Sequence, residues 1–165
     1  QKIALLLNHN INLFGFHLPL DDHPDIGNNV ELGKLLGIKN MQPVKDSLLW
    51  QGELNSNVID FSKLIDAKLD RTPQIFGKQE GKIKNIAWCT GGAQSFIEDA
   101  INLNVDLYLS GEVSEKTPAA AKENNITFIS AGHHATERYG VQALCKHLCA
   151  KFKLQHQYIE VENSV

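Results

Sequence analysis

The second half of the chain alternates short apolar runs with longer amphipathic patterns, and this alternation limits the possible folds more than any other feature of the sequence. The apolar runs are rich in β-branched or aromatic residues, which favours buried strands, and each is followed by a turn and a helical pattern. The predicted strands are 83–89, 105–109 and 126–130, and the predicted helices are 93–102, 114–124 and 135–152. Strands joined through helices favour right-handed crossovers, so we expect an α/β fold with a mostly parallel sheet and flanking helices.

The first half of the chain adds further elements of both kinds. The predicted helices are 1–8, 28–36 (with Gly37 as its C-terminal cap) and 58–69, and the predicted strands are 11–17, 48–54 and 74–77. The prolines within 18–24 predict a loop, because proline does not suit a central strand. A last strand is predicted at 157–161.

Composition and charge exclude several classes of protein. The 165 residues suffice for one domain, or for one domain and part of another. The formal net charge is −3, from 16 basic and 19 acidic residues, which argues against a nucleic-acid-binding surface. No apolar run approaches the ~18 residues of a membrane span and no signal pattern begins the chain, so we expect a soluble protein with no membrane partner.

Two further observations concern the compartment and the extent of the chain. The three cysteines, Cys89, Cys145 and Cys149, lack the CxxC spacing of a metal site and are expected to be free thiols, which predicts a reducing cytoplasm. The chain begins at Gln1 and its only methionine is Met41, so we expect it to be the later part of a longer protein.

The chemistry-bearing side chains follow the predicted strands, at the edge of the sheet where α/β proteins gather ligands. His133 and Glu137 come after strand 126–130 and are four residues apart, so a helix would place them on one face. An imidazole and a carboxylate on one face form half of a divalent-metal site. The alternative is a strand-end histidine and a surface glutamate. If His133 and Glu137 bind a metal, His134 would support a ligand, contact substrate, or merely lie beside the start of the helix.

A second acid of interest comes early in the chain. His17 ends the predicted strand 11–17, and Asp21 follows it after a proline-containing loop. A carboxylate held there could bridge two divalent ions ~3.5–4 Å apart, as in hydrolytic two-metal sites. The alternative is that Asp21 caps a turn before Pro24.

Two turns at other strand ends carry weaker signals. Thr90-Gly91-Gly92 lies between a strand and a helix, where exposed N–H groups could bind an anion or a substrate, although an ordinary tight turn explains it equally well. Glu112 follows another strand and could act as a general base or contact substrate, the alternative being an acid that precedes a helix. Cys89 has no identifiable base beside it and is interpreted as a packing residue.

Four motifs in order carry a resemblance to a known family: NLFGFHLPLDDHPDIGNN (12–29), WCTGGAQSF (88–96), SGEVSE (110–115) and AGHHATER (131–138). With these, the chain resembles the NIF-three-like dinuclear-metal proteins, also known as the GTP cyclohydrolase I type two family. The resemblance runs from Gln1 to about Val161.

The resemblance implies a fold of two similar α/β lobes with mixed, largely parallel sheets. On this basis residues 1–45 would be the remainder of the N-terminal metal-binding lobe, and 46–165 would form the second lobe. It also implies a toroidal homohexamer and two divalent cations per subunit (Zn, Mn, Fe or Mg) in the full-length protein.

The family's metal ligands fall on three residues of this sequence. Asp21 matches the bridging aspartate, His133 and Glu137 match two further ligands, and His17 lies near the site. The remaining ligands of the family are a histidine pair in an HHG motif, which this sequence lacks and which the resemblance places before Gln1.

Two functions follow from the resemblance. The first is a metal-dependent hydrolase acting on a nucleotide or small molecule, with water attacking purine C8 in a GTP cyclohydrolase, and with Glu112 and His134 as the catalytic candidates. The second is a non-catalytic, metal-binding ring that serves as a scaffold or regulatory protein. Nucleic-acid binding through the ring's opening is opposed by the acidic net charge.

Overall fold

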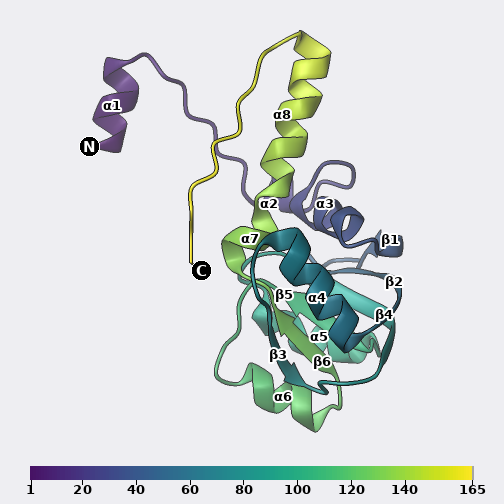
Figure 1. The fold of residues 1–165 in the computed structure, drawn as a ribbon. Helices are drawn as coiled ribbons and strands as arrows, with labels where there is room; N and C mark the ends of the chain where they lie inside the picture. The colour runs from purple at the N-terminus through teal and green to yellow at the C-terminus, as the bar shows by residue number, and fades with distance from the viewer. Residues whose placement is uncertain (165) are drawn as a thin grey trace.

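A computed structural model describes residues 1–164. Its body is a six-stranded sheet with helices on both faces, from which α8 projects (Figure 1). The helices are α1 (Lys2–Asn8), α2 (Leu18–Asp21), α3 (Asn28–Leu35), α4 (Val58–Leu69), the 3₁₀ turn η1 (Gln94–Phe96), α5 (Ile97–Asn102), α6 (Thr117–Glu123), α7 (His133–Glu137) and α8 (Tyr139–Phe152). The strands are β1 (Lys39–Pro43), β2 (Trp50–Asn57), β3 (Gln74–Gly77), β4 (Lys82–Cys89), β5 (Leu107–Ser110) and β6 (Thr127–Ser130).

The sheet is mixed, with strand order β1-β2-β4-β5-β6-β3. The α/β class is confirmed, but the prediction of a mostly parallel sheet is wrong. Only the β4–β5 and β5–β6 pairings are parallel, whereas β1–β2, β2–β4 and β3–β6 are antiparallel. The predicted parallel arrangement holds for β4, β5 and β6, the three strands joined through α5 and α6. It does not extend to β1 and β2, which are neighbours in sequence, or to β3, which pairs at the far edge with β6.

Alternating side chains of the central strands build two separate cores, one on each face of the sheet. Ile86 and Trp88 of β4 face α3 and α4, together with Leu109 of β5. The intervening residues Ala87 and Tyr108 face α5 and α6. A strand that is buried on both faces does not alternate between apolar and polar residues. This explains why the buried parts of β4 and β5 are continuous apolar runs in the sequence.

The helix α4 forms where its pattern predicts it. Phe61, Ile65 and Leu69 lie on its buried face, and the side chain of Asn57 accepts a hydrogen bond from Asp60 N at the start of the helix. Asp70 ends the helix in the left-handed conformation. An amphipathic face and two capping residues therefore fix this helix locally.

The two terminal segments differ from the body. The predicted strands 11–17 and 157–161 are wrong, since neither segment is a strand and the side chains of both are exposed. An apolar run becomes a strand only when a neighbouring strand completes its ladder of hydrogen bonds, and neither segment has such a neighbour among residues 1–164.

The structure also differs from the predicted elements in smaller ways, at turns and helix breaks that hydrophobic periodicity does not encode. The predicted loop 18–24 contains the short helix α2, with Pro19 in its first turn, where the missing N–H costs nothing. The predicted helix 135–152 is two helices separated at Arg138. The polar strand β1 was not predicted.

Among the described residues, no helix is both long and apolar enough to cross a membrane. The division of the chain at residue 45 stays a prediction.

Candidate functional site

The site lies where β4, β5 and β6 end, because the register of the parallel strands brings their following turns together. Cys89 pairs with Ser110, and Ser110 pairs with Ser130. The ladder then continues into the turns, with Gly111 N donating to Gly91 O (2.9 Å) and Gly132 N donating to Gly111 O (2.8 Å). The turns that carry Gly91, Glu112 and His133 are therefore held side by side by backbone hydrogen bonds.

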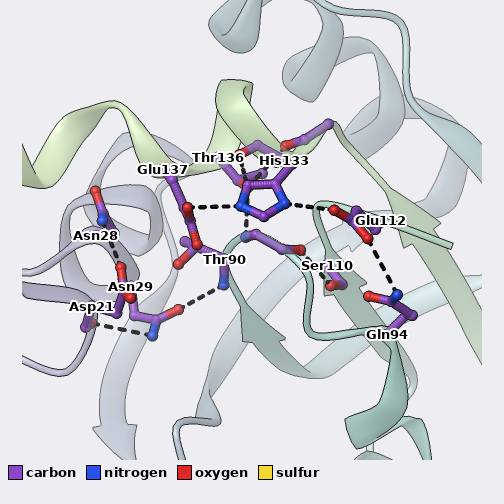
Figure 2. Close-up of polar contacts among 12 residues, drawn as sticks. Asp21, Asn28, Asn29, Thr90, Gln94, Ser110, Glu112, His133, Thr136 and Glu137 are labelled. Carbon is purple, nitrogen blue, oxygen red and sulfur yellow. Dashed lines mark hydrogen bonds and ion pairs between the residues drawn. The ribbon is translucent and has the colours of Figure 1, made fainter. Parts of the chain in front are cut away.

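His133 begins α7 and contacts a carboxylate on each side (Figure 2). Its Nδ1 lies 2.6 Å from Glu112 Oε1, and its Nε2 lies 3.0 Å from Glu137 Oε2. The predicted pairing of His133 with Glu137 across one helical turn is thus present in the structure. The contact with Glu112 joins residues 21 positions apart, and local spacing carries no signal for it.

Glu137 lies directly against the glycine turn. A Cβ atom on Gly91 would overlap the Glu137 carboxylate, and Gly91 also has a φ of +65°. Both the contact and the backbone conformation therefore favour glycine at this position. The turn provides the space into which the carboxylate fits.

Glu112 is held in turn by Gln94, whose Nε2 donates to Glu112 Oε2 at 3.3 Å. A carboxylate on Nδ1 fixes the ring orientation of a histidine and leaves Nε2 as the atom available to a metal. Glu112 therefore orients His133 in this structure.

The charges around His133 are coupled. Burial raises the pKa of the Glu137 carboxyl above its ordinary value, His133 opposes this, and the Asp21 carboxylate raises it further. For His133, burial by itself lowers the pKa, but the hydrogen bond to Glu112 and the charge of Glu137 outweigh burial and raise it. A cation between Asp21 and Glu137 would relieve the repulsion between the two carboxylates.

Asp21 is buried and faces the same cavity as Glu137. The cavity measures about 1020 Å³, and His17, Asp21, Asn28 and Glu137 are among the residues that line it. Asn28 Nδ2 donates to Asp21 Oδ1 at 2.7 Å, which fixes the carboxylate. The early acid and Glu137, the contact partner of His133, therefore line one cavity, although Asp21 reaches it from the helix α2 and not from the end of a strand.

Two asparagines that the sequence patterns did not single out hold this region together. Asn28 Oδ1 accepts from Gly140 N (2.7 Å), which ties α3 to the start of α8. The fully buried Asn29 donates to the backbone carbonyl of Asp21 and accepts from Thr90 N at 2.9 Å. The available signal was a pair of amides on the buried side of a helix, since a buried amide requires hydrogen-bond partners.

His134 faces away from this cluster, toward the C-terminal segment. Its Nε2 lies 2.7 Å from Glu160 Oε1. His17 lines the cavity beside Asp21 and its charge acts on Glu137. The catalytic role expected of His134 and Glu112, and the position of His17 near a metal, stay predictions.

Two N–H groups of the turn Thr90-Gly91-Gly92 donate hydrogen bonds to side chains of the protein itself. Thr90 N donates to Asn29 Oδ1, and Gly91 N donates to Thr136 Oγ1 at 3.0 Å. Carboxylates of Glu137 and Glu112 lie beside the two glycines. Electrostatics at the turn favour a cation over an anion, and its role in binding an anion or substrate stays a prediction.

The side chains present can be compared with the geometry of a metal site. Ligand atoms ~2.1 Å from one ion and at right angles lie ~3.0 Å apart, which equals the separation of His133 Nε2 from Glu137 Oε2. As placed among residues 1–164, no group of three or more His, Cys, Asp or Glu side chains is close enough to hold an ion. His133 and Glu137 therefore fit as one pair of ligands, and Asp21 lines the same cavity as Glu137.

The chain is similar to known proteins over almost its whole length. The sequence profile of Duf34/NIF3 (NGG1p interacting factor 3) matches residues 1–164. The GTP cyclohydrolase 1 type 2 homologs of Pseudomonas aeruginosa and Escherichia coli (strain K12) are 45% and 42% identical, over 99% of this chain and 67% of theirs. The homolog of Allochromatium vinosum is 44% identical over 99% of this chain and 66% of its own. The chain thus spans about two thirds of the length of the curated relatives it matches.

Solved structures agree with the fold. The structure of protein ybgI is 41% identical and superposes with a TM-score of 0.94, over 99% of this chain and 67% of that one. A Thermus thermophilus protein that is 24% identical superposes with a TM-score of 0.88, over 99% of this chain and 66% of its own. The second likeness concerns the fold alone.

Proposed function

The chain belongs to the Duf34/NIF3 family, as its motifs indicate, and from this premise we propose that it binds divalent cations through Asp21, His133 and Glu137 as part of a metal-dependent hydrolase. The relatives' name, GTP cyclohydrolase 1 type 2 homolog, suggests a nucleotide or another small molecule as the substrate. Two similar lobes, a homohexameric ring and two cations per subunit, whether Zn, Mn, Fe or Mg, belong to the same proposal for the whole protein.

The observation that carries the proposal is the His133–Glu137 pair. Its two ligand atoms already have the separation of neighbouring ligands on one ion, at 3.0 Å. His133 is fixed from the other side by Glu112 at 2.6 Å, as histidine ligands usually are by a carboxylate or carbonyl. Asp21, which lines the same cavity as Glu137, adds the negative charge that a cation requires.

In this proposal, some residues of the chain bind the cations and another orients a ligand. Bound divalent cations would lower the pKa of water so that it attacks as hydroxide near neutral pH. Asp21 and Glu137 contribute negative charge, His133 contributes a neutral nitrogen, and Glu112 holds the Nδ1 proton of His133. The cavity of about 1020 Å³ leaves room for a small-molecule substrate beside these groups.

A second candidate function rests on the exposed apolar surface. Ile3, Leu7, Leu13 and Phe14 are each more than 70% exposed, and they lie on α1 and the segment that follows it. Large exposed apolar patches usually mark protein–protein interfaces. This surface favours assembly, which is compatible with a non-catalytic ring that binds metal as a scaffold.

Metal binding is tested by calorimetric titration of Mn²⁺ and Zn²⁺ into the metal-free protein. Glu137→Gln and Asp21→Asn should each weaken binding by at least ~10-fold, because each removes a charged ligand while nearly keeping the side-chain volume. Asp22→Asn is the matched control, since Asp22 is the exposed neighbour of Asp21. Equal affinities in all four proteins would contradict the proposed ligands.

Hydrolysis is tested separately with GTP and a panel of phosphorylated compounds, in the presence of Mn, Zn, Fe or Mg. Metal-dependent turnover that disappears in Asp21→Ala and Glu137→Ala would support the enzyme. Tight metal binding without turnover of any compound would instead favour the scaffold.

A further inference from the structure

The C-terminal segment 153–164 folds back from the end of α8 and returns to α7 (Figure 1). All of its side chains are exposed. Polar contacts tie it to the body at separate points: His156 Nδ1 lies 3.3 Å from Cys149 Sγ, and Ser164 O accepts from Arg71 at 2.7 Å. Glu160 makes a third contact, which lies next to the candidate metal site.

The Glu160 carboxylate binds in a notch formed by His134 and Arg138 of α7 and its C-terminal boundary. Oε1 lies 2.7 Å from His134 Nε2, and Oε2 lies 3.4 Å from the Arg138 guanidinium. The hydroxyl of Tyr158, on the segment itself, donates to Oε2 at 2.8 Å. The notch therefore already accommodates an anionic group with two oxygen atoms.

The notch is held by contacts that do not involve Glu160. Arg138 donates to Leu69 O at 2.7 Å, and its guanidinium lies 5.6 Å from the centre of the Tyr139 ring. The guanidinium of Arg71 packs against Gly132, two residues before His134. His134 can donate through Nε2–H in its neutral or its charged form. If Glu160 left, the contacts with Leu69 and Tyr139 would keep the Arg138 guanidinium in place.

The contact made by Glu160 can be displaced. Its side chain is 44% exposed, and exposed ion pairs contribute little to stability because water and salt screen them. A tethered side chain competes with a free ligand at an effective concentration of the order of millimolar. A dianionic phosphate at similar concentrations would present more charge and a third acceptor oxygen to the same donors.

The position of the notch connects it to the candidate metal site. His134 directly follows His133. Gln157, on the same C-terminal segment as Glu160, lines the cavity that Asp21 and Glu137 also line. Displacing the segment would therefore expose the notch and open that cavity at one side.

We propose that the notch between His134 and Arg138 binds the phosphate group of a phosphorylated substrate, and that Glu160 occupies it as a substitute anion in the free protein. This inference rests on the proposed hydrolase function for its choice of substrate class. The C-terminal segment then acts as a strap that an incoming phosphate releases.

The test is a two-dimensional NMR titration of the full chain in chelator, so that phosphate binding is measured without metal. Inorganic phosphate and a nucleoside 5′-monophosphate are added separately to the wild type and to Glu160→Gln. We expect shifts at His134 and Arg138, and several-fold tighter binding in Glu160→Gln because the competing charge is gone. Tighter binding of the nucleotide than of inorganic phosphate would identify a phosphorylated substrate as the source of the group.

Two further variants keep the result interpretable. Glu162→Gln removes a charge from the same exposed segment and should bind phosphate as the wild type does. Arg138→Gln should abolish phosphate binding. His134→Asn should weaken phosphate binding, and this variant provides the test if Arg138→Gln fails to fold. Equal affinities of the wild type and Glu160→Gln, or shifts confined to other residues, would overturn the inference. Neither result would bear on metal binding, which is measured without phosphate.

Discussion

The central strands β4, β5 and β6 and the two terminal segments are both rich in apolar residues, yet only the strands are buried by packing. All four residues of β5 are buried between two parallel neighbours. Segment 11–17 has a similar apolar and aromatic composition, but Phe14 is 76% exposed. An apolar composition is therefore compatible with a strand but does not create one. The strand forms and is buried only where other strands pair with it on each side and helices cover both of its faces.

The largest expected effect comes from removing one aromatic side chain in each region. Phe128→Ala should destabilise the protein by ~3–5 kcal/mol, because the buried ring packs against Tyr108 and Phe76 and its loss leaves a cavity. Phe14→Ala should change the free energy of unfolding by less than ~0.5 kcal/mol. Urea denaturation of both variants measures the difference. A cost for Phe14→Ala near that of Phe128→Ala would mean that the terminal segment is packed in solution, and the contrast would fail.

A smaller effect separates backbone strain from contact at the site. Gly91 and Gly37 both have positive φ, +65° and +71°, but only Gly91 has neighbours where a Cβ would lie. Gly37→Ala should cost ~1 kcal/mol from strain alone. Gly91→Ala should cost ~1–2 kcal/mol more, because the Glu137 carboxylate must move.

The same pair of variants also reports on the site. Gly91→Ala should weaken Mn²⁺ binding in calorimetric titration, whereas Gly37→Ala should leave it unchanged. If both alanine variants unfold at the same urea concentration, the close fit of Glu137 against the turn has no energetic consequence.

The smallest expected effect concerns pH. The pKa of His133 is raised from 6.5, so its contribution to stability is complete below about pH 6.5 and is lost as the pH rises through the folded-state value. The raised pKa of Glu137 acts in the same direction from 4.5 upward. Glu112→Gln removes a negative charge and the charge-assisted character of a hydrogen bond, both of which raise the His133 pKa, so stability should change less between about pH 6 and pH 9.

This effect is measured from urea midpoints at both pH values and from the NMR titration of His133. Glu115→Gln, an exposed acid in the same loop, is the control and should follow the wild type. An unchanged His133 titration in Glu112→Gln would show that the contact at 2.6 Å does not govern the imidazole.

The elements that can be predicted from the sequence are those whose own residues carry the pattern. The helix α4 and the strands β3, β4 and β6 carry their signals in their own residues, such as the Asn57 cap and the apolar run before Ser130, and these predictions are confirmed. Strand direction at β2 and β3 depends on partners far along the chain, which periodicity does not encode. The strand β1 is too polar to be recognised before its partner β2 is known.

The site divides in the same way. The four-residue spacing of His133 and Glu137 is local and could be predicted, and their 3.0 Å contact is present. The bond from Glu112 to His133 and the buried contacts of Asn28 and Asn29 join distant residues. A single sequence gives no means of pairing such residues, because each of them alone is also explained as a cap or a turn residue.

The amide of Asn28 has a mechanical consequence. One end of it holds the Asp21 carboxylate at 2.7 Å, and the other end holds the first turn of α8 through Gly140 N, also at 2.7 Å. The long helix α8 projects from the body (Figure 1), so a small tilt at its base is a large displacement at its tip. Any such tilt must either break one of these two bonds or carry Asp21 with it. The angle of α8 is thus coupled, through the side chain of Asn28, to the position of the Asp21 carboxylate in the cavity.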